Sequence, residues 1–149
     1  MQVQFIKWLV VFIVISAMSS NAGAKQYTVS SPDEYNAIAS SLKAGDDVIL
    51  QNGVYQDFEI LLVGQGSAEK PITLTAQTKG KVILSGRSNL KLAGQYLEVS
   101  GLVFKDGYTP SSAVIAFRKD AQTPANYSRV SEVVIDEYSN PDRQESDYW

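Results

Sequence analysis

The sequence contains no histidine and no cysteine. Without histidine, the chain lacks the commonest general base and the commonest transition-metal ligand. Any catalysis within it would therefore need Lys, Tyr, Arg or carboxylates, and any metal would be a hard cation bound by oxygen. Without cysteine there are neither disulfides nor thiolate chemistry. The fold must be held by packing and backbone hydrogen bonds.

The chain also lacks an apolar run long enough to span a bilayer. The uninterrupted run at residues 8–15 is far shorter than the roughly 20 residues that a membrane helix needs. Lys7 precedes this run, and Ala22-Gly23-Ala24 fits a small-residue cleavage site. We therefore interpret residues 1–24 as a signal peptide with Lys25 as the mature N-terminus. We expect a secreted or periplasmic protein with no membrane contact after cleavage.

The chain also has no excess of positive charge. The chain has 13 Lys and Arg against 16 Asp and Glu, a net charge of −3. This balance argues against nucleic acid as a partner. It leaves room for an anionic sugar polymer, because an acidic protein can still carry a local basic groove.

One helix is predicted after the cleavage site. Ser31 is placed as N-cap and Pro32 at the first helical position, and Glu34 completes a capping box. Apolar residues follow at helical spacing, and a glycine then ends the pattern: Tyr35, Ile38, Leu42 and Gly45. The pattern predicts an amphipathic helix over residues 32–43.

Short β-rich runs, separated by Gly, Asn, Asp and Pro, fill the rest of the chain. No crossover helix follows any of them, which disfavours a doubly wound α/β sheet. The runs are residues 48–50, 58–63, 72–76, 82–84, 90–92, 96–104, 114–117 and 130–135.

An internal repeat separates a solenoid from a sandwich. Residues 99–104 match residues 130–135 at an offset of 31, with four apolar positions and one serine in register. Stacked solenoids show periods of this size. A solenoid also explains the predicted helix, which would cover the open apolar end of the stack. At the other end, residues 147–149 bring no cap, so we expect the chain to be part of a longer protein.

The sequence contains an ordered series of segments at residues 42–55, 70–76, 80–86 and 96–107. This series resembles polysaccharide lyase family 6, which contains alginate lyases and the dermatan-cleaving chondroitinase B. Residues 140–149 lean toward the alginate branch. It implies an all-β fold, a right-handed single-stranded parallel β-helix. Residues 25–149 would be its N-terminal part, with the capping helix and the first coils.

The resemblance implies a secreted lyase that cleaves alginate, an acidic polysaccharide, by β-elimination. In such enzymes a cation, often calcium, neutralises the uronate carboxylate, a lysine removes the C5 proton and an arginine assists the leaving oxygen. We expect these catalytic residues and metal ligands on coils beyond Trp149, so this chain should hold neither catalytic residues nor calcium. The alternatives are a chondroitinase B-like dermatan sulfate lyase, a non-catalytic β-helix adhesin or carbohydrate-binding protein, and another β-helix enzyme such as a pectin-type lyase or a hydrolase.

Substrate-binding candidates within the chain are few. Arg143 offers a planar fork suited to a carboxylate, and Tyr148 and Trp149 offer aromatic faces for a sugar ring. The alternative is a loop arginine with core aromatics. Four further cations could face a polyanion but are interpreted as solvated surface residues: Lys105, Arg118, Lys119 and Arg129.

Two adjacent acidic pairs could in principle hold calcium, Asp46-Asp47 and Asp136-Glu137. Each sits at a strand boundary, where acidic residues often serve turns. Neighbouring residues on a strand also point to opposite faces, so the two carboxylates of a pair would not converge. We therefore interpret both pairs as structural.

Overall fold

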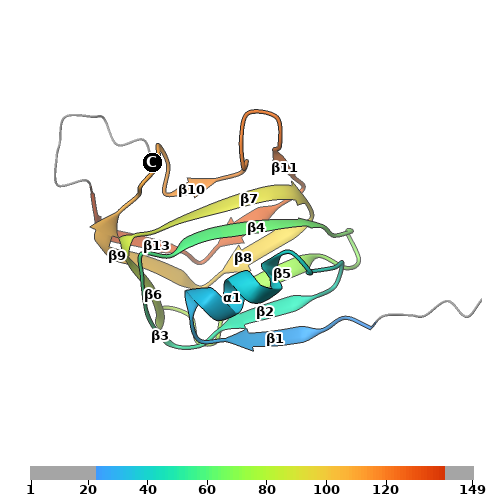
Figure 1. Cartoon of the computed structure of the whole chain (residues 1–149), viewed down its shortest axis with the longest axis horizontal. Coiled ribbons are helices and arrows are strands. Elements are labelled where there is room, and N and C mark those ends of the chain that lie inside the picture. Colours follow the sequence, from blue (N-terminus) through green and yellow to red (C-terminus); the bar gives the residue numbers. More distant parts are fainter. Residues whose placement is uncertain (1–22, 140–149) are drawn as a thin grey trace, which may run out of the picture.

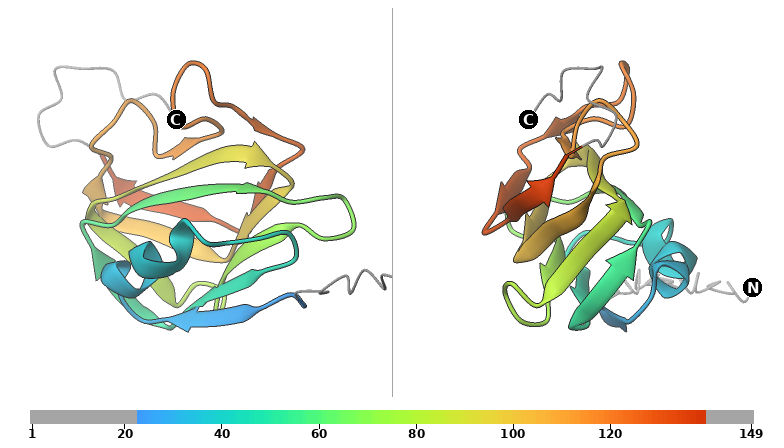
Figure 2. Two further views of the ribbon diagram at one scale, coloured as in Figure 1. Left: turned by 45° about the vertical axis from the view of Figure 1, so that its right-hand side comes forward. Right: turned by 90° about the vertical axis from the view of Figure 1, so that its left-hand side faces the viewer.

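The computed structural model describes residues 23–139 as a parallel β-solenoid of about three turns with one short helix. Successive coils stack in sequence order, from the blue N-terminal strand to the red C-terminal strands (Figures 1 and 2). The predicted all-β parallel β-helix is confirmed. No helix in the described part is long and apolar enough to cross a membrane.

Three parallel sheets form the sides of the solenoid (Figure 1). The first runs β1 (Gln26–Val29), β2 (Asp47–Leu50), β5 (Ile72–Ala76), β8 (Leu97–Ser100) and β12 (Arg129–Ser131). The second contains β3 (Gly53–Gln56), β6 (Val82–Arg87), β9 (Leu102–Tyr108) and β13 (Val134–Tyr138). In the third, β4 (Glu59–Gln65) pairs with β7 (Asn89–Gln95), and β7 pairs with both β10 (Ile115–Ala116) and β11 (Ala125–Asn126).

The predicted repeat corresponds to one coil. Val130 pairs with Val99 across β12 and β8, and Ile135 pairs with Phe104 across β13 and β9. Other coils have other lengths, because Val82 pairs with Leu102. Because the coil lengths differ, the sequence shows the repeat in only one pair of matching segments.

Alternate residues of the strands point into the solenoid and stack between coils. Each fully buried aliphatic side chain contributes about 1.5–3 kcal/mol by leaving water. The stacks contain Val48, Leu50, Ile60, Leu62, Ile72, Leu74, Val82, Leu84, Leu90, Leu92, Leu97 and Leu102.

The helix α1 (Pro32–Ala39) lies beside β1 and β4 and covers the N-terminal end of the core (Figure 1). Its N-cap is Ser31, whose hydroxyl accepts the Glu34 N–H at 3.2 Å. Buried Tyr35 donates its hydroxyl to the Leu61 carbonyl at 3.0 Å and meets Phe58 edge-to-face at 5.5 Å. The predicted role of the helix as a lid is confirmed.

The capping box and the end of the helix differ from the prediction. The Glu34 carboxylate accepts the Ser30 N–H and hydroxyl, at 2.6 and 2.9 Å, rather than the N–H of the N-cap residue. The helix ends at Ala39 instead of residue 43. Its last turn is tight, because the Ser41 N–H and hydroxyl both bond to the Ile38 carbonyl. Leu42 is nevertheless buried, as the apolar spacing predicted.

Three strand predictions also need correction. Residues 130–135 are divided between β12 and β13, and Glu132 between these strands adopts φ +55°. Residues 96–104 form two strands, β8 and β9, because Gly101 adopts φ +83° and turns the chain from the first sheet to the second. A Cβ at this position would also lie 3.1 Å from the Ala76 Cβ. Three short strands were not predicted: β1, β3 and β11. Each has only two to four residues, too few to show an alternating pattern.

Candidate functional site

An excursion of the chain interrupts the third sheet in its last described coil. Ile115 pairs with Leu90 and Ala125 pairs with Gly94, so β10 and β11 share one partner strand. Residues 117–124 between them form a loop that stands away from the solenoid (Figure 1). The loop is closed by backbone hydrogen bonds from the Lys119 N–H to the Thr123 carbonyl at 3.0 Å and from the Ala125 N–H to the Phe117 carbonyl at 2.8 Å.

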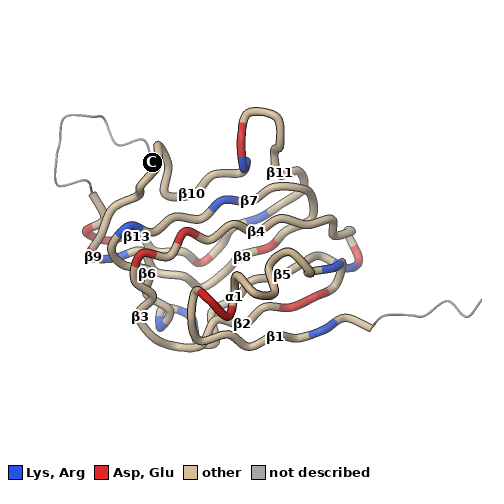
Figure 3. Tube along the Cα trace, in the orientation of Figure 1, with Lys and Arg blue, Asp and Glu red and all other residues tan. Residues whose placement is uncertain are grey.

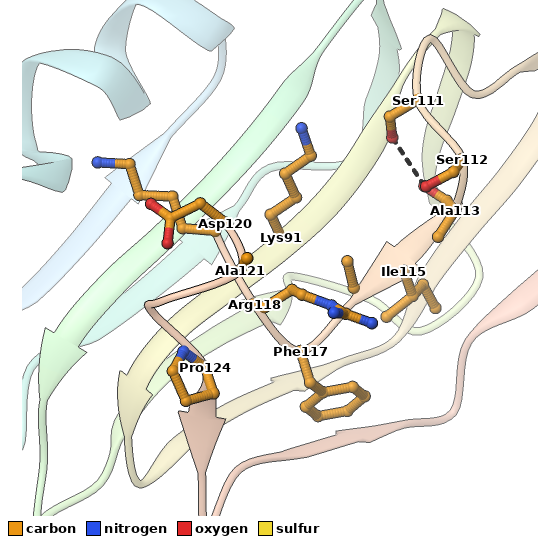
Figure 4. A pocket seen from close by; sticks show the side chains of 12 residues that line it. Lys91, Ser111, Ser112, Ala113, Ile115, Phe117, Arg118, Asp120, Ala121 and Pro124 are labelled. Carbon is orange, nitrogen blue, oxygen red and sulfur yellow. Dashed lines mark hydrogen bonds between the residues drawn. The ribbon is translucent and has the colours of Figure 1, made fainter.

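A hollow of about 750 Å³ lies beside this loop. Figure 4 shows Arg118 extending across it between Lys91, which comes from β7, and Phe117. The lining residues are Lys91, Ser111, Ser112, Ala113, Ile115, Ala116, Phe117, Arg118, Lys119, Asp120, Ala121 and Pro124.

The hollow carries an excess of positive charge. Lys91, Arg118 and Lys119 line it, and none of them forms a salt bridge within residues 23–139. Asp120 is the acidic residue among the lining side chains. Hydrogen bonds from the Thr123 side chain and the Gln122 N–H lower the pKa of Asp120, so its carboxylate is charged and occupied within its own loop. The three cations thus have no salt-bridge partner among the described residues. Figure 3 shows Lys and Arg positions on β7 and on the loop between β10 and β11.

The lining groups of the hollow are of kinds that attract an anionic ligand. Arginine and lysine attract a carboxylate, and arginine can hold it through two parallel hydrogen bonds. The Phe117 side chain is 43% exposed and offers an apolar face, while the Ser112 hydroxyl offers a hydrogen-bonding group. The hollow therefore combines cationic, hydrogen-bonding and apolar groups on one surface.

The predicted substrate residues fall into three groups. Arg143, Tyr148 and Trp149 lie outside the described residues. Lys105 and Arg129 pair with acids on adjacent coils, Lys105 with Asp136 at 2.8 Å and Arg129 with Glu98 at 3.4 Å. The hydrogen bond to Asp136 raises the pKa of Lys105. Only Arg118 and Lys119, of the four surface cations, belong to the hollow.

The acidic pairs have structural partners. Asp46 is 4% exposed, and its carboxylate accepts the N–H groups of Lys25 and Lys43, both at 2.9 Å. Asp136 binds Lys105 across the coil boundary. In the described range, no three acidic side chains come together as metal ligands would. The carboxylates of Asp46 and Asp136 are thus engaged by groups of the fold itself.

Lys91 was missed by the sequence reasoning. It lies between Leu90 and Leu92, which are both buried, and this alternation already placed its side chain on the outer face of the strand. Nothing in the sequence indicated that the loop after β10 would fold beside it.

Fold and surface together define the capped N-terminal coils of a parallel β-helix with a cationic hollow on one side. A family model described as chondroitinase B matches residues 29–149. The chain belongs to this family, polysaccharide lyase family 6. Among curated protein sequences, none matches the chain significantly.

Three solved structures illustrate the relationship. The PL6 family alginate lyase AlyGC is 53% identical over 83% of this chain, with a TM-score of 0.80. A mannuronic acid specific family 6 lyase from human gut microbiota is 33% identical over 78%, with a TM-score of 0.70. The family 6 lyase Pedsa3628 from Pseudopedobacter saltans is 38% identical over 73%, with a TM-score of 0.65. The chain spans 17%, 27% and 24% of these proteins, respectively.

Proposed function

We propose that this chain forms the cap and first coils of an exported polysaccharide lyase that cleaves alginate by β-elimination. The observation that carries the proposal is the 53% identity to an alginate lyase over 83% of the chain. A chondroitinase B-like activity on dermatan sulfate is the second candidate, supported by the description of the family model. Export is supported by the charge of Lys7, the apolar run after it and the small residues before Lys25.

We place the proton-abstracting lysine, the arginine at the leaving oxygen and any calcium ligands outside residues 23–139. Elimination from a uronate creates negative charge next to a carboxylate, so the site needs concentrated positive charge around the reacting ring. The Asp46 carboxylate is bound by backbone N–H groups, and the Asp136 carboxylate is bound by a lysine side chain. We assign to the residues of the described coils a role in binding and in shaping the fold.

The cationic hollow is our candidate for a contact with the polymer. Its cations, Lys91, Arg118 and Lys119, form no salt bridge within residues 23–139 and would attract a uronate carboxylate, and Phe117 would face the ring. Because such a contact is the same before and during the reaction, its loss should weaken substrate binding more than the chemical step. Arg143 and Tyr148 remain further candidates for substrate contact.

The test is to express the coding sequence together with whatever follows the codon for Trp149. The absorbance of unsaturated uronate is then followed on alginate and on dermatan sulfate, with and without a calcium chelator. We expect cleavage of alginate, and no cleavage by the 149-residue chain alone. Faster cleavage of dermatan sulfate would favour the second candidate. A folded product that binds alginate but never cleaves it would contradict the lyase assignment and favour a non-catalytic carbohydrate-binding protein.

A further inference from the structure

The carboxylate of Asp46 is buried and is bound by backbone N–H groups. The residue is 4% exposed and stands just before β2. Its Oδ1 atom accepts the Lys25 N–H and its Oδ2 atom accepts the Lys43 N–H, each at 2.9 Å. Within residues 23–139 it forms no salt bridge. Carboxylates this deeply buried are normally paired with a positive charge, because desolvation of a lone charge is costly.

The backbone holds Lys25 firmly at this carboxylate. The Lys25 carbonyl accepts the Asp47 N–H at 2.8 Å, and β1 begins at the next residue and pairs with β2. The Lys25 nitrogen is thus held on the carboxylate by a parallel strand pair. A small hollow of about 160 Å³ adjoins it, lined by Gly23, Lys25, Tyr27, Ser41, Lys43, Ala44 and Asp46.

We propose that removal of residues 1–24 completes this site by turning the Lys25 backbone nitrogen into an α-ammonium group that forms an ion pair with Asp46. Signal peptidase would hydrolyse the Ala24–Lys25 bond, so that water supplies a carboxylate to the released peptide and the Lys25 nitrogen becomes a free amine, which is protonated at neutral pH. The inference rests on the proposed export and cleavage after Ala24, but it does not depend on lyase activity.

The ion pair would join the two ends of the cap. Asp46 already connects β1, through Lys25, with the turn after α1, through Lys43. A charged donor strengthens such a hydrogen bond relative to a neutral N–H. Cleavage would therefore stabilise the cap of the solenoid only after export, and the uncleaved precursor would keep a looser N-terminal end.

The stability added by this ion pair should decrease as the pH rises. A free α-amino group has a pKa of about 7.7–8.0, and pairing with Asp46 raises it. The added stability is then complete below about pH 7.7 and is lost as the pH rises through the higher pKa of the folded state. The other charged or titratable groups around the contact are Asp47, Tyr27 and the side chains of Lys25, Lys43 and Lys70.

The experiment compares N-termini on the complete exported product. One form begins at Lys25, released from a fusion partner by a protease that leaves no extra residue, and the other retains Gly23 and Ala24. Each is made with Asp46 and with Asp46→Asn. At pH 7 we expect the form that begins at Lys25 to unfold about 3 °C or more above the extended form. The gap should vanish in Asp46→Asn, and it should shrink at pH 10.

Equal melting temperatures for the two forms, or a gap that persists in Asp46→Asn, would overturn the proposal. If Asp46→Asn does not fold, acylation of the α-amine is measured by mass spectrometry in the two Asp46 forms. We expect Lys25 to react about tenfold more slowly than the α-amine of the extended form, as for a pKa raised by one unit. Equal rates would refute the ion pair. N-terminal sequencing of the exported protein checks the premise, and a mature N-terminus other than Lys25 would also overturn the inference.

Discussion

The N-terminal cap and the last described coil are held to the solenoid by different kinds of contact. At the cap, α1 buries Tyr35 against Phe58, and the side chains of Tyr35 and Asp46 bond to backbone atoms in the interior. At β12 and β13, Tyr138 makes a buried contact, but the other coil-to-coil contacts include three exposed salt bridges, and the Val134 side chain is 51% exposed. The bridges are Lys79–Glu132, Lys105–Asp136 and Arg129–Glu98.

The two kinds of contact should contribute very different amounts to the free energy of unfolding. Buried hydrogen bonds and aromatic packing are costly to lose, because a removed partner leaves a void or an unsatisfied polar group. Exposed ion pairs contribute little, since water and salt screen them. Substitutions at the two ends should therefore differ strongly in their effect on stability, and the following predictions are arranged from the largest effect to the smallest. All use the complete product, with stability measured by thermal or denaturant unfolding.

Truncation of the lid should have the largest effect. Tyr35→Ala removes a fully buried ring from its contact with Phe58 and leaves the Leu61 carbonyl without its hydroxyl donor. We expect a loss of about 3–5 kcal/mol of unfolding free energy. Tyr127→Ala is the matched control, because Tyr127 is 75% exposed, and it should cost far less. Similar losses for the two variants would show that the helix does not act as a lid.

Loss of one buried hydroxyl should have a smaller effect. Tyr138 lies in β13, where its hydroxyl accepts the Ser88 N–H at 2.9 Å and lies 2.6 Å from the Ser88 carbonyl oxygen. Tyr138→Phe keeps the ring but leaves the Ser88 N–H unsatisfied, so we expect a loss of about 1–3 kcal/mol. Tyr127→Phe serves as the control. A Tyr138→Phe variant as stable as the parent protein would mean that water replaces the hydroxyl.

The cap was more predictable than the cationic hollow because its signals are local. Ser31, Pro32 and the apolar spacing after them lie within one stretch of chain, and they determined the start, face and role of α1. The predicted end of the helix was wrong because Ser41 closes a tighter turn on Ile38. This turn depends on hydrogen-bond geometry rather than on composition.

The hollow depends on contacts between distant segments. The alternation of Leu90, Lys91 and Leu92 could have placed Lys91 on an outer face, but Arg118 lines the same hollow only because β10 and β11 both pair with β7. Two-residue strands carry no periodic signal, so the loop between them was not predicted to fold back. The pairing of Lys105 with Asp136 could have been inferred, since both occupy equivalent positions of the 31-residue repeat.

Neutralising the hollow should affect binding and leave stability unchanged. In the double variant Arg118→Ala and Lys119→Ala, two exposed cations of the loop are lost without any salt bridge being broken in the described part. We expect the KM for alginate to rise about threefold to tenfold, in line with about 1 kcal/mol of lost attraction, with little change in kcat. Lys105→Ala is the matched control for loss of a surface cation. An equal rise in KM for Lys105→Ala would show that the effect comes from the overall charge of the protein rather than from the hollow. An unchanged KM in the double variant would exclude the hollow from substrate binding.

The exposed salt bridges should give the smallest effect of all. Lys105 reaches Asp136 across the boundary between β9 and β13, and the hydrogen bond raises the pKa of Lys105 above its usual value. The stability that this ion pair contributes is present at neutral pH and is lost only as the pH rises through the raised pKa of Lys105. Because both side chains remain substantially exposed, Lys105→Met should leave the melting temperature within experimental error at pH 7. Asp136→Asn, made alongside it, tests the same contact from the other coil. If either variant lowered stability as much as Tyr138→Phe does, the ion pair would be a structural element of this end, and the contrast with the cap would no longer hold.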